Sequence, residues 1–159
     1  MVEEQLFKDI MARIPSAVSV VTSTSEQGYH GVTVSSFGSL SLDPPLMYVC
    51  LLKENQSHGR LKEAQQFVIN VLPLEHTFFA EQFAGRTPLA DSEFSRVPHT
   101  VGSDDIPRIA GCLSWVTCRH WTQYDGGDHT IFVGEIIDLE LGEGDDPLIY
   151  FDREFVGLN

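Results

Sequence analysis

A titratable side chain stands beside two glycines in the segment YDGGDHTIFVGEI, residues 124–136. The Gly-Gly-Asp sequence is typical of a turn, and the β-branched and aromatic residues after it predict a strand, so His129 is expected where that strand begins. The glycines would let a ligand approach the backbone, and a neutral imidazole can donate a hydrogen bond to it. The alternative is structural: a strand-end histidine satisfied by Asp128 or by water.

Small hydroxyl side chains alternate with valine in a second segment, GVTVSSFGSLS, residues 31–41. In a strand, Thr33 and Ser35 would share one face while the valines beside them face a core. Accessible amides and hydroxyls of this kind can hold a flat heterocycle, and a helix beginning near Ser57, a good N-cap, can hold a phosphate at its N-terminus. A hydroxyl-rich strand at a solvated sheet edge is the alternative.

The acidic composition excludes several classes of partner. The chain has 159 residues and a formal net charge of -13, whereas binding to a phosphate backbone requires a basic surface. We therefore expect no nucleic-acid partner and no attraction to an anionic membrane surface. The chain shows no signal-peptide pattern and no apolar run near the roughly 20 residues of a membrane helix, which favours a cytoplasmic protein.

The cysteines favour reduced core thiols over disulfides. Cys50, Cys112 and Cys118 are odd in number, lie in apolar stretches and form no Cys-x-x-Cys pair. We expect no metal, and a site on Cys118 and His120 is a weak alternative. The glycine signatures of Rossmann and P-loop nucleotide sites are absent, and so are a Gly-x-Ser-x-Gly elbow and paired acid and base carboxylates. A nucleotide would have to be held in another way.

The coarse pattern contains more strand than helix. Apolar residues at helical spacing predict an amphipathic helix at residues 3–13, which Pro15 prevents from continuing. Helices are also expected after Ser57 and at residues 75–83, and residues 85–106 predict a long ordered loop. Strands are expected at residues 17–24, 31–41, 46–52, 67–72, 112–121, 129–141 and 148–151. Their short connections favour a mainly β, antiparallel barrel in one domain, residues 1–159.

Seven segments follow one another along the chain in this order: IPSAVSVVT, GVTVSSFGSLSLDPPLMYVCLLKENQS, FVINVL, FAGR, IAGCLSWVTCR, GGDHTIFVGEI and PLIYFDREF. In sequence and order they resemble the short-chain flavin reductases of two-component monooxygenase systems. Several separate motifs at plausible spacing are far more specific than one tripeptide. The first segment departs from the family's Pro-Thr-Gly-Val, because Ser16 and Ala17 stand at its second and third positions.

The resemblance implies an FMN-binding split β-barrel with a few short flanking helices. It implies a homodimer that binds FMN or FAD at the subunit interface and reduces it with hydride from NADH or NADPH. The reduced flavin would then be supplied to a partner flavin-dependent monooxygenase. Such a hydride transfer requires that two rings be positioned, and it requires no general acid or base from the protein.

The resemblance also assigns site residues. It implies flavin contacts at Thr33, Val34, Ser35, Ser36, Cys50, Leu51 and Leu52, phosphate contacts at Lys53, Ser57 and His58, and a second phosphate or ribityl wall at Phe83, Ala84, Gly85 and Arg86. It implies nicotinamide contacts at Gly127, Asp128, His129, Tyr150, Phe151 and Arg153, with His129 as the catalytic candidate. Lys53, Arg60 and Arg86 are cations in phosphate-associated segments, which agrees with an anionic cofactor.

Two other classes of function compete with this one. A flavin-binding barrel could retain its flavin and act on another acceptor or substrate. A structural barrel that had lost its cofactor would have a damaged serine strand or lack Gly-Asp-His, and both are intact here. The sequence holds no determinant that separates FMN from FAD or NADH from NADPH.

Overall fold

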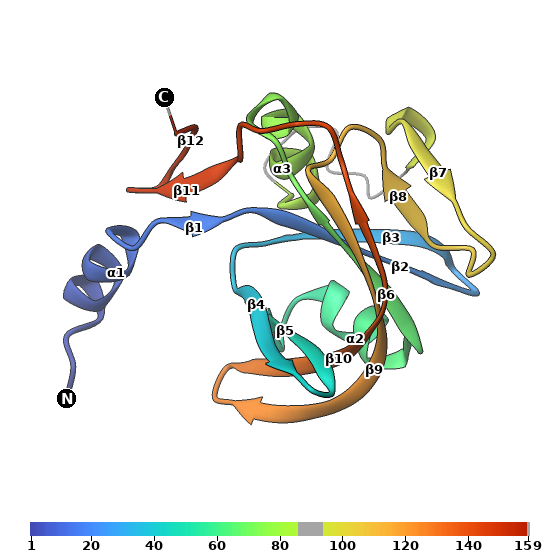
Figure 1. Cartoon of the computed structure of the whole chain (residues 1–159). Helices are drawn as coiled ribbons and strands as arrows, with labels where there is room; N and C mark the ends of the chain where they lie inside the picture. The colour runs from blue at the N-terminus through green and yellow to red at the C-terminus, as the bar shows by residue number, and fades with distance from the viewer. Residues whose placement is uncertain (86–93, 159) are drawn as a thin grey trace.

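Seven antiparallel strands form the main sheet of the computed structural model, in the order β3-β2-β6-β9-β10-β5-β4. The structure describes residues 1–85 and 94–158. Figure 1 shows the sheet curling so that β4 and β5 lie below β2 and β3. These strands are β2 (Ser19–Ser25), β3 (Gly28–Val34), β4 (Phe37–Leu42), β5 (Pro45–Leu52), β6 (Gln66–Val71), β9 (Ser114–Gly126) and β10 (His129–Leu141). Every neighbouring pair is antiparallel, which confirms the expected strand arrangement.

The two longest strands bend where their register shifts. The pairing of β9 with β10 is irregular between Val133 and Gly134 and again between Ile136 and Asp138. Bulges of this kind increase local twist, which helps a sheet to curl. At Gly134 an added Cβ would stand 2.6 Å from the Cβ of Cys118, so only glycine fits there without movement of the core. The curled sheet encloses a core that includes Val21, Val32, Val49, Leu51, Phe67, Ile69, Cys118 and Phe132.

A second apolar cluster lies on the other side of the sheet. It is covered by the helical segments and short strands that follow β6 and fold back over the sheet. It contains Val18, Val20, Leu72, Ala80, Phe83, Phe94, Ile109 and Leu148. The elements around it are the 3₁₀ turns η1 (Leu74–His76) and η2 (Phe94–Arg96), helix α3 (Thr77–Phe83) and the paired strands β7 (His99–Val101) and β8 (Pro107–Ile109). The sequence predicts a loop over much of this region, so β7, β8 and η2 are elements that it misses.

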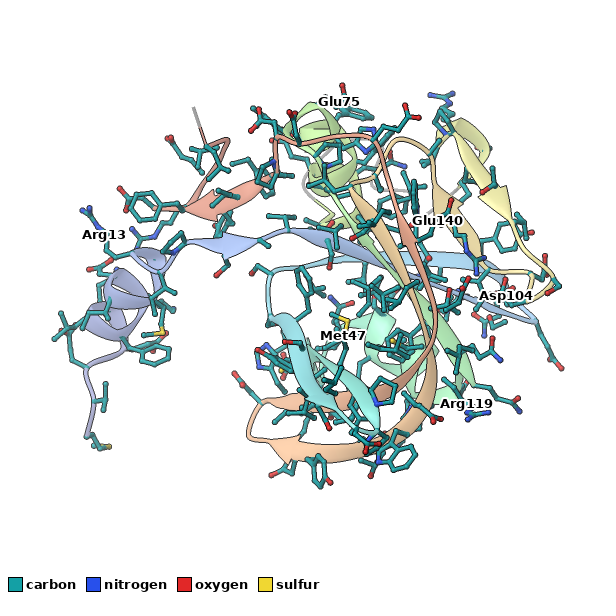
Figure 2. All side chains as sticks on the ribbon, viewed as in Figure 1. Arg13, Met47, Glu75, Asp104, Arg119 and Glu140 are labelled. Atoms are coloured by element: carbon teal, nitrogen blue, oxygen red, sulfur yellow. The ribbon has the colours of Figure 1, made fainter. Side chains whose placement is uncertain are left out.

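Helix α1 (Glu4–Ala12) stands away from the barrel, beside a small sheet of β1 (Ser16–Ala17), β11 (Ile149–Phe151) and β12 (Glu154–Val156). The helix confirms the sequence-based expectation, yet none of its residues is buried. Two ion pairs, Arg13 with Asp152 and Arg153 with Asp9, tie it to the β11–β12 turn. Figure 2 shows Arg13 at this junction and the helix side chains clear of the rest of the chain.

Two local expectations are wrong. The expected strand 31–41 is two strands, because the chain leaves the ladder at Ser35 and Ser36 between β3 and β4. Helix α2 (Gln56–Glu63) is capped by Asn55, whose side chain accepts from the amide of Ser57, so Ser57 lies inside the helix rather than at its N-cap. An asparagine with non-helical φ and ψ is a strong N-cap, and it stands only two residues earlier.

Candidate active site

The serine segment between β3 and β4 is fastened to β5 by two hydrogen bonds. The amide of Cys50 donates to the carbonyl of Ser36 at 2.8 Å, and the Ser36 hydroxyl donates to the carbonyl of Cys50 at 3.0 Å. Ser35 and Ser36 are both exposed, and among the described residues their amides have no hydrogen-bond partner. Two free donors at a rigid barrel edge fit a heterocycle rich in carbonyls and ring nitrogens, as a flavin is.

Strand β10 brings the Gly-Asp-His turn to the same edge. β10 pairs with β5 so that His129 lies opposite Leu52 and Thr130 opposite Leu51. Leu51 is buried in the core, whereas Leu52 is exposed and Cys50 is partly buried. Residues 35, 36, 50, 52 and 127–129 therefore gather at one end of the barrel, as the sequence-based assignment requires.

His129 is bonded to its neighbour. Its Nδ1 lies 2.7 Å from Oδ1 of Asp128, and this hydrogen bond holds the pKa of Asp128 below its ordinary value. Asp128 is therefore an ionised acceptor at neutral pH, so Nδ1 of His129 carries the hydrogen. This contact agrees with the alternative in which His129 is a structural residue satisfied by Asp128. However, 41% of the His129 side chain is exposed and Nε2 has no partner among the described residues, so the ring can still contact a ligand.

The phosphate candidates on α2 have partners within the chain. Nε2 of His30 lies 2.7 Å from Oγ of Ser57, and Nε2 of His58 lies 2.8 Å from Oγ1 of Thr130. Burial lowers the pKa of both rings, so they are neutral at pH 7. The sequence reasoning missed His30 and Thr130. The alternation of side chains along β3 was the signal for His30, and the position directly after His129 was the signal for Thr130.

Thr33 is not part of an exposed hydroxyl face, whereas Val34 faces the core as the strand alternation predicts. The Thr33 hydroxyl donates to the carbonyl of Ala80 in α3 at 2.7 Å, and Val34 is buried in the core. Both residues support the serine segment from within. The hydroxyl row expected on one strand face is thus reduced to the exposed pair Ser35 and Ser36.

The FAGR segment ends helix α3. Phe83 is 6% exposed and packs against Phe94, which gives it a place in the core rather than on a ligand surface. Ala84 and Gly85 are exposed, and Gly85 has a φ of +71°, the left-handed conformation that closes many helices. Arg86 lies outside the described residues, so its assignment stays a prediction.

Two of the last three candidates, Tyr150 and Phe151, lie on a different sheet from His129, and the third, Arg153, lies in the turn that follows them. Tyr150 and Phe151 are partly buried on β11, and Tyr150 packs against Phe155. Arg153 is paired with Asp9 of α1. Figure 1 shows β11 and the start of β10 in separate parts of the fold. A single copy of the chain therefore does not bring the two halves of the expected nicotinamide site together.

An open groove of about 1240 Å³ lies elsewhere, between the β2–β3 turn, the β7–β8 loop and β10. Figure 2 labels two of its acidic residues, Asp104 and Glu140. None of the sequence-predicted site residues lines it. The candidate site is instead a shallow edge of the barrel within a single chain.

The cysteines are free thiols, as expected, and Cys118 is fully buried in the core. Across residues 1–85 and 94–158, no group of three or more His, Cys, Asp and Glu side chains is arranged to hold a metal ion. None of the helices in that part of the chain combines the length and apolarity needed to cross a bilayer.

The fold and the site together define a class of protein, an antiparallel split β-barrel with a polar edge suited to a flavin. The family model described as "Flavin reductase like domain" matches residues 11–159. The chain belongs to the flavin reductase-like family, which confirms the resemblance found in the sequence.

Two relatives and one solved structure illustrate the relationship. The chain is 34% identical over 159 residues to the actinorhodin polyketide dimerase of Streptomyces coelicolor, covering 98% of this chain and 87% of the relative. It is 33% identical to the reductase component of the 4-nitrophenol 4-monooxygenase/4-nitrocatechol 2-monooxygenase of Rhodococcus opacus, covering 94% and 78%. The NADH:FAD oxidoreductase SgcE6 of Streptomyces globisporus, solved in complex with NAD and FAD fragments, superposes with a TM-score of 0.89 at 29% identity, covering 98% and 94%.

Proposed function

We propose that this protein is an NADH-dependent flavin reductase that supplies reduced FMN or FAD to a partner monooxygenase. The observation that carries the proposal is the register of β5, which sets the serine segment at Cys50 and His129 opposite Leu52. Flavin-binding and nicotinamide-binding candidates thus meet at one barrel edge. The whole chain serves as one reductase domain. The expectation of a cytoplasmic protein stays a prediction.

When bound, the flavin supplies the chemistry by accepting hydride at N5 from nicotinamide C4. The chain's own residues bind and orient. The free amides of Ser35 and Ser36 are donors fixed in place by the Cys50 hydrogen bonds, so they can stabilise negative charge at the ring edge without reorganising. Behind them, the hydrogen bond of partly buried Thr33 to Ala80 and the burial of Val34 in the core keep this edge rigid.

His129 orients the nicotinamide as a hydrogen-bond acceptor. In the tautomer that donates from Nδ1 to Asp128, Nε2 carries a lone pair. That atom can accept from the carboxamide NH₂ group. The hydrogen bond then runs in the direction opposite to the donation expected from the sequence, where the tautomer could not be assigned.

We expect the protein to oxidise NADH only when FMN or FAD is added. The expectation follows because the proposed role of the chain is to position two rings, while the flavin accepts the hydride. Purified protein, stripped of flavin, should be mixed with each flavin and each nicotinamide while absorbance at the nicotinamide band is followed. Binding of flavin without consumption of either nicotinamide would contradict the reductase assignment.

A second candidate is a barrel that retains its flavin and acts on another acceptor. The observation that favours it is the similarity to a relative named as a polyketide dimerase. Gel filtration after reduction separates the two candidates. A reductase of the proposed kind releases reduced flavin, whereas the second candidate elutes with its flavin still bound.

The active form is a homodimer in this proposal. Two features support it: the separation of Tyr150 and Arg153 from His129 within one chain, and an uncovered apolar face on α1. The apolar side chains of this helix at Leu6, Phe7 and Ile10 are each more than half exposed. An amphipathic helix normally buries such a face against the rest of the protein or against a partner subunit. A second copy would cover this face and complete the nicotinamide site.

We expect Ile10→Glu to shift the protein from dimer to monomer and to lower NADH oxidation, because the charge would enter the buried interface. Light scattering at matched protein concentrations measures the first effect. Lys8→Gln, which changes the charge of the same helix by the same amount at an exposed polar position, serves as the control. A wild-type monomer that binds one flavin per chain and reduces it would contradict the proposal.

A further inference from the structure

Lys53, directly after β5, makes three hydrogen bonds to the β9–β10 hairpin. Its Nζ donates to Oδ1 of Asp125 and to the carbonyl of Gly127, each at 2.5 Å, and its amide donates to the carbonyl of Asp128 at 2.9 Å. Lys53, the residue that follows the flavin-associated strand, thus contacts Asp125 near the end of β9 and both residues of the turn that precedes His129.

Besides the Lys53 contacts, the turn is held by the β9–β10 ladder and by the hydrogen bond between Asp128 and His129. Gly126 pairs with His129, so Gly127 and Asp128 form a two-residue turn, and Gly127 has a φ of +80°, as the first position of a type II′ turn requires. An added Cβ at Gly127 would meet no atom within 4 Å, so the turn extends into open space. Without packing, its position depends on hydrogen bonds.

The charge of Lys53 also acts on the two aspartates of this hairpin, Asp125 and Asp128. The hydrogen bond from Lys53 lowers the pKa of Asp125, and the Lys53 charge also contributes, after the His129 hydrogen bond, to the lowered pKa of Asp128. The ammonium group has three hydrogens, and two of them are used by the turn. Its charge is shared with two carboxylates rather than left free for a phosphate.

We propose that Lys53 is a positioning residue for His129, which fixes the nicotinamide-binding turn relative to the flavin-binding edge. The proposal rests on the reductase function above and assigns Lys53 a role different from the phosphate contact that the sequence implies. Through the turn, Lys53 sets the distance between two binding sites while contacting neither ligand.

The kinetic test uses Lys53→Met, which keeps the aliphatic stem and removes the charge and the side-chain donors. We expect the KM for NADH to rise about tenfold, with the flavin Kd within about twofold of wild type. Asp125→Ala should act in the same direction, and the double variant should be no worse than the worse single variant. Lys53→Arg should return KM toward the wild-type value. Lys62→Met, an exposed lysine on α2, is the control for charge.

A second measurement does not depend on activity. Hydrogen exchange of the amides in residues 127–129 should be about tenfold faster in flavin-free Lys53→Met than in wild type, because the turn has lost its attachment. Faster exchange in a protein that never oxidises NADH would leave the positioning role standing and overturn the reductase function. A raised flavin Kd with an unchanged KM would overturn the proposal in favour of a phosphate contact. Unchanged KM and unchanged exchange would reduce Lys53 to a surface ion pair and also overturn it.

Discussion

His129→Ala is expected to lower kcat/KM for NADH by roughly ten- to a hundredfold while leaving the flavin Kd nearly unchanged. The range corresponds to the loss of one hydrogen bond in a site from which water is excluded once both rings are bound. The ring lies at the start of β10, opposite Leu52, and so at the edge where the nicotinamide must approach.

Asp128→Ala tests the tautomer behind this expectation. Without the carboxylate, the hydrogen of the imidazole is free to move from Nδ1 to Nε2, and an acceptor becomes a donor. We therefore expect Asp128→Ala to lose part of the same kcat/KM although it leaves the ring in place. If the ring merely closes the turn, both variants should lose thermal stability and keep their kinetics.

Gln123→Ala is the matched control because Gln123 is exposed on β9 of the same hairpin and has no assigned role. It should match wild type in kinetics, flavin binding and melting temperature. Melting temperature, flavin Kd and NADH kinetics should be measured on each variant. Reduced stability with unaltered kinetics in His129→Ala would remove His129 from the site while leaving the serine segment as the flavin candidate.

The strands that build the site could be read from the sequence because their signals are local. β10 was expected at residues 129–141, where it lies, since a Gly-Asp turn and a β-branched run mark its start. The break at Ser35 and Ser36 could not be read, because serine is compatible with both a strand and a loop. It is the pairing of Ser36 with Cys50, a contact across 14 residues, that decides it.

The partners of the site residues were beyond the sequence for the same reason. Lys53 is separated from Asp125 by 72 residues and His30 from Ser57 by 27, so neither contact has a local pattern. A lysine beside an expected anionic cofactor was reasonably assigned to a phosphate. Only the fold shows that its ammonium group is bound by the carboxylate of Asp125 and the carbonyl of Gly127.

Asn70→Leu is expected to reduce the free energy of unfolding by about 2 to 4 kcal/mol, the largest effect on stability that we expect from one side chain. Asn70 is 0% exposed on β6, near the middle of the main sheet. Its Nδ2 donates to the carbonyl of Val20 at 2.9 Å and to Oγ1 of Thr22 at 3.0 Å, and its Oδ1 accepts from the amide of Ile109 at 2.8 Å. One amide thus joins β2, β6 and β8.

Leucine has the same branched heavy-atom skeleton but is larger than asparagine, so the change leaves no cavity and its cost combines the polar loss with overpacking of the buried site. The carbonyl of Val20 loses a donor, and the amide of Ile109 is left buried without an acceptor, a desolvation cost that no water can offset in a closed core. Gln65→Leu, an exposed change of the same chemistry just before β6, should alter stability by less than about 0.5 kcal/mol. Urea unfolding at one fixed protein concentration measures both, since a dimer's stability depends on concentration. A loss below about 1 kcal/mol for Asn70→Leu would mean that β8 rearranges to satisfy Ile109, and that the second apolar cluster is held to the sheet by packing rather than by this amide.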